Sequence, residues 1–277
     1  GCGRPPASRR RALSGARAMQ VLVTRPAREA QLWVAWLRGR GLNAQPLPLM
    51  EIVAARDPLP LQAAWAGLAG YDALMFVSGN AVDHFFGSNM PAARAGAAWG
   101  AINFRAWSTG PGTAEALHRA GVPAVRIDTP AADAGQFDSE ALWQQVRGQV
   151  VAGFRVLIVR GGDAAGRLAG RDWLARQLQA AGAVVEEVAV YERQLPDWSA
   201  AQRTLAAGAA GDGSVWLFSS SEAIGNLQHL LPGQPWQAAR AVATHPRIAQ
   251  AARDAGFGVV CESRPALADV VASIESI

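Results

Sequence analysis

The chain has 277 residues, of which 50% are hydrophobic and 17% are charged. This composition allows a large buried core, in one large or two smaller domains. No apolar run is long enough to cross a membrane, so a membrane protein is not expected. The two cysteines, Cys2 and Cys261, exclude a disulfide framework and favour a reducing, cytoplasmic location.

The positive charge is concentrated at one end of the chain. All 26 basic residues are arginines, and residues 1–18 contain five of them and no acidic residue. Removing these five from the net charge of +4 leaves −1, which argues against nucleic-acid binding by the rest of the chain. We expect residues 1–18 to form a disordered extension before a natural start at Met19, with a transit peptide as the alternative.

The first elements alternate between strands and helices. Residues 20–24 predict a strand, and the helix after Pro26 has an apolar stripe expected to face the core, formed by Leu32, Trp33, Trp36 and Leu37. Residues 44–53 contain two prolines and predict one strand that leaves its sheet to become a linker. Further strands are predicted at residues 73–77, 101–108 and 122–127, and helices at residues 61–68, 81–86, 114–120 and 138–146.

Residues 156–193 form one complete unit. Residues 156–159 predict a buried strand, residues 160–162 a tight turn, and residues 184–190 a second strand. A helix between them is indicated by the spacing of Leu168, Leu174 and Leu178. A strand–helix–strand unit of this length connects parallel strands, so it predicts a parallel sheet.

The last third of the chain continues this alternation. It predicts strands at residues 214–218, 240–244 and 258–261, and helices at residues 200–210, 222–231, 246–255 and 267–274. Three segments repeat at an offset of 135 to 142 residues, namely VLVTRP and VLIVRG, MFVSGNAV and LFSSSEAI, and STGPGTAE and ATHPRIAQ. The predicted fold class is therefore α/β, with two similar doubly wound parallel-sheet domains. Each half of the chain begins with a strand that closes one domain and leads to the other.

Polar residues or glycine follow most of the predicted strands. In open parallel sheets, ligands bind beyond the carboxyl ends of the strands, where helix N-termini favour anions. The residues at these positions are Arg25, Ser78, Gly110, Arg160, Ser219 and Thr244. Two facing domains with such ends predict a cleft for a polyanion rich in carboxylates. For any one of these residues, helix capping alone is the simpler explanation.

Other motifs are weaker. GPGTAE at Gly110, with Asp128 beyond it, is an incomplete dinucleotide fingerprint. Ser78 and Ser220 lack the sequence context of a hydrolase nucleophile, and the histidines show no metal-binding spacing. Tyr191 differs, because a phenol at the end of a buried strand needs a polar partner or an open cleft.

A series of motifs resembles the uroporphyrinogen-III synthase family in order and spacing, over nearly all of residues 19–277. These are VTRP at 23, the strand and serine turn at 75–80, GPGTAEAL at 110, DSEAL at 138, VRGGDAAGRL at 159, AGAVVEEVAVYER at 181, FSSSEAI at 218 and the helix at 246–257. The resemblance implies two α/β domains joined by a two-stranded linker, the second inserted into the first. Domain 1 would comprise residues 19–52 and 192–277, and domain 2 residues 53–191.

The resemblance also implies a substrate and a reaction. Hydroxymethylbilane, a linear tetrapyrrole with carboxylates around its rim, would lose its hydroxyl as water and close to uroporphyrinogen III. The path runs through an azafulvene and a spiro intermediate, and ring D becomes inverted. This substrate agrees with the predicted polyanion cleft, and Tyr191 matches a tyrosine proposed in the family to assist departure of the hydroxyl. The family implies a monomeric lyase of haem biosynthesis without metal or cofactor, with a transient hand-over from hydroxymethylbilane synthase.

The resemblance adds candidate substrate-binding residues to the strand ends. Thr113 matches a family hydroxyl, and the other additions are Ser139, Gly161, Ser220 and Arg247. Arg247 stands in a His-Pro-Arg-Ile turn where some members have Gly-Pro-Thr-Thr, and we expect it to supply a charge-assisted contact with a carboxylate. Two other classes of function stay open, a two-domain protein that binds a small anion without catalysis and a nucleotide-dependent oxidoreductase built on the Gly110 turn.

Overall fold

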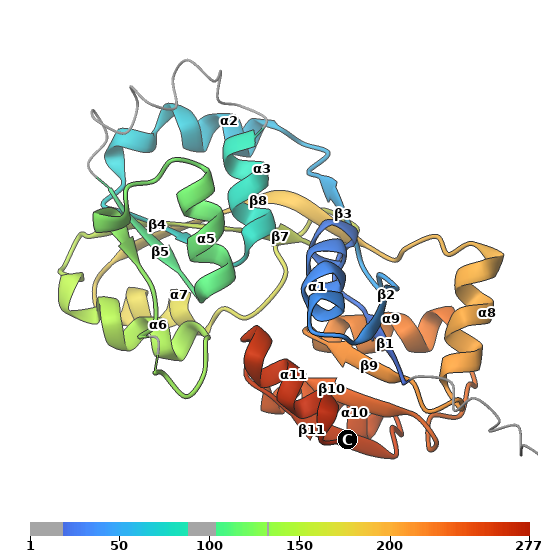
Figure 1. Cartoon of the computed structure of the whole chain (residues 1–277). Coiled ribbons are helices and arrows are strands. Elements are labelled where there is room, and N and C mark those ends of the chain that lie inside the picture. The colour runs from blue at the N-terminus through green and yellow to red at the C-terminus, as the bar shows by residue number, and fades with distance from the viewer. Residues whose placement is uncertain (1–18, 88–103, 132) are drawn as a thin grey trace, which may run out of the picture.

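A computed structural model describes residues 19–87, 104–131 and 133–277, and these form two sheets with helices on both faces (Figure 1). Both sheets are mainly parallel, so the predicted α/β fold class is confirmed. None of the helices in these ranges is long and apolar enough to cross a membrane. The extension predicted at residues 1–18 and the start of the strand predicted at residues 101–108 lie outside the described residues.

The first sheet has the strand order β11-β10-β9-β1-β2. Its strands are β1 (Gln20–Val23), β2 (Asn43–Pro46), β9 (Val215–Phe218), β10 (Arg240–Ala243) and β11 (Val259–Glu262). One face is covered by α1 (Ala27–Gly39) and α11 (Leu267–Glu275), and the other by α8 (Ala200–Ala209), α9 (Ser221–Leu230) and α10 (Pro246–Asp254). Because strand residues alternate between faces, β1 buries Val21 and Val23 in one core and Leu22 in the other.

The second sheet has the strand order β3-β8-β7-β4-β5-β6. Its strands are β3 (Glu51–Ala54), β4 (Ala73–Phe76), β5 (Arg105–Ser108), β6 (Ile127–Asp128), β7 (Arg155–Gly162) and β8 (Val184–Gln194). One face is covered by α2 (Leu59–Ala66), α3 (Gly79–Gly87) and α5 (Pro111–Arg119), and the other by α6 (Ser139–Val146) and α7 (Trp173–Ala180). We refer to the parts built on the two sheets as the first and second domains.

The two sheets repeat one topology. With β3 set aside, β2-β1-β9-β10-β11 corresponds to β8-β7-β4-β5-β6. This correspondence pairs β1 with β7, β9 with β4, and β10 with β5, which are the segments paired by the sequence repeat. Equivalent strands therefore come at different points along the chain in the two domains, because β1 precedes the second domain whereas β7 lies late within it.

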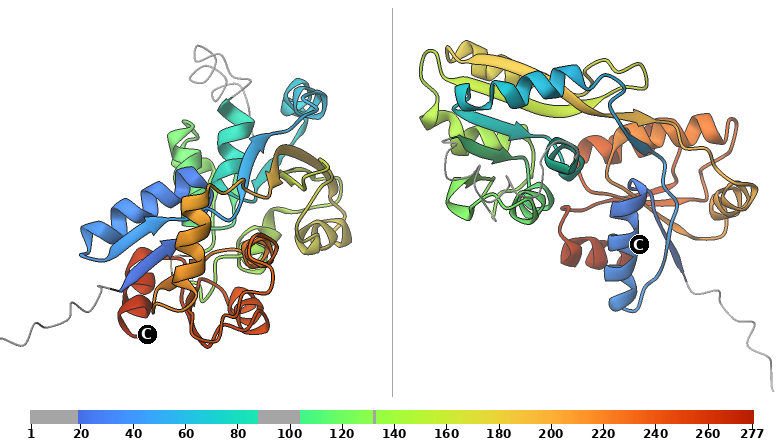
Figure 2. Two further views of the ribbon diagram at one scale, coloured as in Figure 1. Left: turned by 90° about the vertical axis from the view of Figure 1, so that its right-hand side faces the viewer. Right: turned by 90° about the horizontal axis from the view of Figure 1, so that it is seen from above.

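Two crossings of the chain join the domains and run side by side (Figure 2). One leads from β2 to β3 and the other from β8 toward α8, and β3 pairs antiparallel with the end of β8, from Ala54↔Tyr191 to Glu51↔Gln194. The segment predicted at residues 44–53 does leave its sheet and become a linker, but it is not one strand: it is divided into β2 and β3, and Leu47 and Leu49 between them pack in the first domain's core. The domain division predicted at residues 52/53 and 191/192 falls within β3 and β8 and stays a prediction.

The turn predicted at residues 160–162 is also wrong. Arg160, Gly161 and Gly162 continue β7, because β8 extends beside them and pairs Gly161 with Tyr191. The register shifts between Arg160 and Gly161, where β8 carries an extra residue in a bulge. The pair of glycines therefore belongs to a long strand.

Three further local predictions differ from the structure. Residues 122–127 form a 3₁₀ turn (Ala124–Arg126) followed by the short β6, and Val125 is 80% exposed, so this segment has no buried face to hold a full strand. Helix α7 begins at Trp173, and Leu168 forms a bridge with Gly162 before it. The core-facing stripe of α1 is narrower than predicted, because Leu32 and Trp36 are about half exposed.

Candidate functional site

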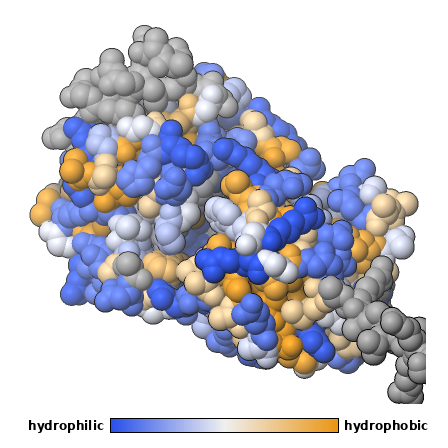
Figure 3. Space-filling model, in the orientation of Figure 1, coloured by the Kyte–Doolittle hydropathy of each residue, from blue (hydrophilic) through white to orange (hydrophobic). Residues whose placement is uncertain are grey.

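The candidate site is organised by the points at which strand order reverses. These lie between β1 and β9 in the first sheet and between β7 and β4 in the second. Ligands of open α/β sheets bind in the crevice that opens at such points. Arg25 and Ser219 follow β1 and β9, and Gly161 and Ser78 lie at the ends of β7 and β4. On the face seen in Figure 3, hydrophilic residues border a hollow between the two domains.

Tyr191 lies at the reversal point of the second sheet. The residue is 3% exposed, and its ring occupies the space that a Cβ atom at Gly161 would need. Its hydroxyl lies 3.3 Å from Oγ of Ser78, and this Oγ also accepts the N–H of Ala81 at 3.1 Å in the first turn of α3. The structure thus brings together Tyr191, Gly161 and Ser78, and it holds the phenol by contacts on both sides.

His84 is a neighbour of Tyr191 that the sequence did not indicate. The two ring centroids are 5.7 Å apart. Burial lowers the pKa of His84, and the charge of Asp83 opposes this effect. His84 therefore favours its neutral form, which adds no positive charge beside the phenol.

Arg25 links the first domain to the second through Glu29. Its guanidinium lies 3.1 Å from Glu29 and 4.7 Å from the ring centroid of Trp33. Burial lowers the pKa of Arg25, with the nearby Glu29 opposing, and its Nε is buried without a hydrogen-bond partner among the described residues. Glu29 also accepts a hydrogen bond from Asn80 at 2.8 Å, and Arg28 pairs with Asp83 at 2.6 Å, so α1 and α3 are joined beside Ser78.

A second contact between the domains joins the N-termini of α6 and α10. Asp138 caps α6 by accepting the N–H of Ala141 at 2.9 Å, and its other oxygen lies 3.5 Å from Nε2 of His245. His245 caps α10 by accepting the N–H of Arg247 at 3.1 Å. The predicted residues Ser139 and Arg247 therefore lie next to the two caps that face each other.

Arg160 lies away from Tyr191. Alternation along β7 places its side chain on the sheet face opposite to the one that carries the ring of Tyr191. There the guanidinium pairs with Glu187 and donates to the carbonyl of Arg171 at 3.0 Å. Arg171 in turn binds both oxygens of Glu140 at 2.6 and 2.7 Å and, with a smaller effect of Arg247, lowers the pKa of Glu140 to about 2.

The remaining predicted residues lie in the first turns of helices or beside them. Thr113 is 7% exposed, and its N–H donates to the carbonyl of Gly110 at 3.2 Å. Ser220 caps α9 by accepting the N–H of Glu222 at 3.2 Å. Ser219 is half-buried before this cap, and Thr244 is buried at the end of β10. These positions suit both helix capping and the predicted binding of anions.

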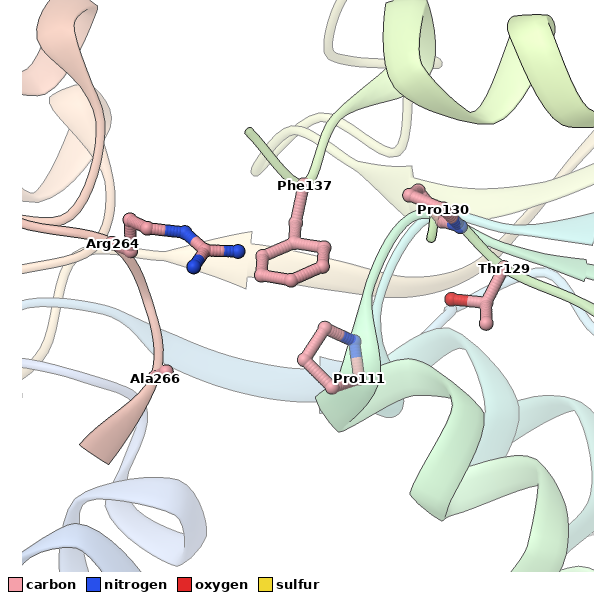
Figure 4. A pocket seen from close by; sticks show the side chains of 6 residues that line it. All are labelled: Pro111, Thr129, Pro130, Phe137, Arg264 and Ala266. Carbon is pink, nitrogen blue, oxygen red and sulfur yellow. The ribbon is translucent and has the colours of Figure 1, made fainter. Parts of the chain in front are cut away.

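The sequence prediction missed a cavity of about 350 Å³ between the domains (Figure 4). Its lining residues are Pro111, Thr129, Pro130, Phe137, Arg264 and Ala266. The strand-end rule would have found part of this lining, because Thr129 follows β6 and Arg264 lies two residues beyond β11. Phe137 has no such signal, since it lies in a loop of small residues.

Comparisons with known proteins agree on one family. The family model described as Uroporphyrinogen-III synthase HemD matches residues 31–272. A protein named uroporphyrinogen-III synthase from Salmonella typhimurium is 29% identical over 243 residues, which cover 86% of this chain and 92% of that protein. Another of the same name, from Synechococcus elongatus, is 31% identical over 176 residues, which cover 64% of this chain and 61% of that protein.

A solved structure adds evidence on the fold. The crystal structure of uroporphyrinogen-III synthetase from Helicobacter pylori superposes with a TM-score of 0.55, at 16% identity, and the match covers 93% of this chain and 99% of that one. At this identity the likeness shows a shared fold. Because the family model spans most of the sequence, the chain belongs to the uroporphyrinogen-III synthase family.

Proposed function

We propose that the chain closes hydroxymethylbilane to uroporphyrinogen III with inversion of ring D and loss of water, as a hydro-lyase that uses no cofactor. One observation on the geometry of the candidate site supports the proposal. Tyr191, the hydroxyl of Ser78 and the backbone of Gly161 meet at the reversal point of the second sheet. The family assignment supplies the substrate class.

Helix N-termini and arginines around the cleft bind the substrate carboxylates in this proposal. Arg25 offers a partly buried guanidinium with one carboxylate partner, and Arg247 is exposed at the start of α10. Ser78 and Ser220 stand at the first turns of α3 and α9, where N–H groups and the helix dipole favour anions. Carboxylates held at several such points would fix the flexible chain in the conformer that closes with inversion, which is the main task of a catalyst for this reaction.

The chemical step assigned to Tyr191 is hydrogen-bond donation to the hydroxyl that leaves ring A. As the carbon–oxygen bond breaks, its electron pair goes to oxygen, which departs as water with the proton that the ring A nitrogen gives up, and a neutral azafulvene remains. Ring D then attacks this electrophile through its substituted carbon, the spiro intermediate fragments and recloses with loss of a ring proton, and the ring A nitrogen regains a proton. Substrate therefore equals product plus water. A phenol carries an O–H donor and suits donation better than acting as a base.

The oxidoreductase alternative is weakened by two contacts. Asp128, the acidic residue of the incomplete fingerprint, is held by Arg105 at 2.5 and 2.8 Å instead of being open to a ribose. Gly110 lies against Phe137, with 3.1 Å between the position of a Cβ at Gly110 and Cβ of Phe137. The turn thus has a packing reason for its glycine. We further propose a cytoplasmic monomer that receives its substrate by transient hand-over from hydroxymethylbilane synthase.

The decisive experiment supplies fresh hydroxymethylbilane and identifies the product isomer by chromatography after oxidation to the porphyrin. The proposal expects type III product in excess of the type I product that forms without enzyme. Type I product alone, at the uncatalysed rate, would overturn it. In that case calorimetry with NAD would test the oxidoreductase alternative, and calorimetry with small carboxylates would test a binding protein.

A further inference from the structure

We propose that the cavity lined by Phe137, Arg264 and Thr129 is a subsite for one carboxylate-bearing pyrrole of the substrate, and that Arg264 binds the carboxylate. This inference rests on the proposed function and extends it to residues that no part of the sequence prediction included. It names Arg264 and Thr129 as binding residues and Phe137 as the apolar wall on which the pyrrole packs.

The cavity combines a cation with an apolar wall. The guanidinium of Arg264 lies 5.2 Å from the centroid of the Phe137 ring, and in Figure 4 the ring lies between Arg264 on one side and Pro130 and Thr129 on the other. Arg264 comes from the first domain and Phe137 from the second, so the domains build this corner jointly. A hydrogen bond of 2.7 Å from Arg264 to the carbonyl of Ala134 fixes the guanidinium there. The carboxylate of Asp269 lies 4.0 Å away, at the limit of an ion pair.

A polar group lines the cavity on the side of the Phe137 ring that is turned away from Arg264. The hydroxyl of Thr129 points into the space in Figure 4, and this buried oxygen has no hydrogen-bond partner among the residues that the structure describes. A buried hydroxyl without a partner costs free energy, so its position is explained by a ligand that supplies one. Pro111, the first residue of α5, brings a helix N-terminus to the same wall.

These features define the class of ligand. The cavity volume of about 350 Å³ lies at the lower end of the range for small-molecule sites, about 300–1,000 Å³. A flat apolar ring fits the faces of Phe137 and the prolines, a carboxylate fits the positive charge of the Arg264 guanidinium, and a second polar substituent fits the hydroxyl of Thr129. A pyrrole with carboxylate side chains has all three parts, whereas a free inorganic anion would leave the apolar wall unused.

Gly110 keeps this wall in place. A Cβ at Gly110 would lie 3.1 Å from Cβ of Phe137, closer than ordinary contact, so a larger residue would force Phe137 to shift. Gly110, which was predicted from the sequence to bind substrate, therefore has a second role. It leaves room for Phe137 in the position that it holds beside Arg264.

The test compares Arg264→Gln, Arg264→Lys and Thr129→Val with the unchanged chain, using hydroxymethylbilane as the varied substrate. Arg264→Gln should raise KM about tenfold or more, because it removes a charge-assisted hydrogen bond, and Arg264→Lys should recover part of the loss. Thr129→Val should raise KM about fivefold, the effect of one neutral hydrogen bond. The control is Arg176→Gln, since Arg176 is an exposed residue of α7 paired with Asp172 away from the cavity.

Small-angle scattering of each variant separates binding from domain positioning, because Arg264 also bonds across the domain boundary. An unchanged scattering profile with a raised KM for both Arg264→Gln and Thr129→Val supports the subsite. An unchanged KM in both variants overturns it, and so does a raised KM confined to Arg264→Gln with more widely separated domains. If the unchanged chain makes no type III product, the proposed function fails instead, so the two failures are distinguishable.

Discussion

The ring of Tyr191 occupies the space that a side chain on Gly161 would need. The two residues face each other across β7 and β8 at the bulge, where the register shift pairs them directly. The glycine thus sets the height of the ring above the sheet, while Ser78 holds the hydroxyl. Two residues therefore position the phenol. Gly161 leaves room for its ring, and the hydroxyl of Ser78, which also accepts a hydrogen bond in the first turn of α3, contacts its oxygen.

Gly161→Ala should displace the ring of Tyr191 and lower kcat about tenfold or more, because small misplacements of a catalytic group cost large factors in rate. Overpacking should also reduce the free energy of unfolding by about 1–3 kcal/mol. Steady-state kinetics and chemical denaturation measure the two effects. Gly208→Ala is the control, because it lies in α8 with nothing within 4 Å of its Cβ position. A normal kcat in Gly161→Ala would show that the height of the ring does not matter.

Tyr191→Phe should cut kcat about 100-fold while the fold stays intact, since general acid catalysis typically contributes at least that factor. The substitution keeps the ring and removes the hydroxyl that bonds to Ser78, so the free energy of unfolding should change by about 1 kcal/mol. Turnover and thermal melting, recorded on the same samples, check both statements. Near-normal turnover would remove Tyr191 from the mechanism.

The fold was predictable because its strands are short apolar runs that end in turns and helix starts. The segment from Val156 to Gly162 shows where this reasoning fails. Two glycines after an apolar run indicate a turn by local rules, but here a long parallel neighbour carries the strand onward, and the glycines leave room for Tyr191. Only a contact between residues that are distant in sequence distinguishes the two outcomes.

Arg247→Ala should raise KM about tenfold with little change in kcat, because the exposed guanidinium stands at the start of α10 beside the domain boundary. Arg253→Ala is the matched control at the other end of the same helix, where Arg253 pairs with Glu262 at 3.1 Å. Initial rates over a range of substrate concentrations give both constants. An unchanged KM in Arg247→Ala would show that this residue only faces solvent.

Glu140→Gln should lower stability at neutral pH and lose this effect in acid. The hydrogen bonds from Arg171 hold the pKa of Glu140 at about 2, below the usual value of about 4.3. The carboxylate therefore stabilises the folded state above its unfolded-state pKa, and this contribution disappears as pH falls through about 2. Since both side chains are about 40% exposed, we expect only about 0.5 kcal/mol.

Denaturation midpoints of the unchanged chain and Glu140→Gln, measured between about pH 7 and about pH 3.5, should therefore keep a constant difference down to about pH 4.3 and begin to approach each other below it. A difference that stays constant over this range would show that the effect of the substitution comes from packing and not from charge. Arg176→Gln, which breaks an exposed pair on α7, again provides the comparison.

Residues of the candidate site differ in how far sequence rules could find them. Sequence rules could identify Tyr191, because a phenol at the end of an apolar run is unusual. They could identify Ser78, because it follows a predicted strand. Phe137 was not, because its importance depends on Arg264 reaching it from the other domain. The partnership of Asp138 and His245 has the same origin. Contacts that form between domains leave no periodic pattern in the chain.

The order of the strands along the chain also determines which sheet can close first during synthesis. Strand β1 pairs with β9, with Val21 opposite Val215, so the first sheet cannot close until the whole second domain has been made. At about 5–20 residues per second, β1 waits on the order of 10 to 40 s for β9, its second neighbour in the sheet. The strands β3 to β8 of the second sheet follow one another without interruption and can close first. The nascent β1 can pair with β2 on one edge, but its other edge and its apolar faces stay uncovered by β9 and the C-terminal helices until the end of synthesis.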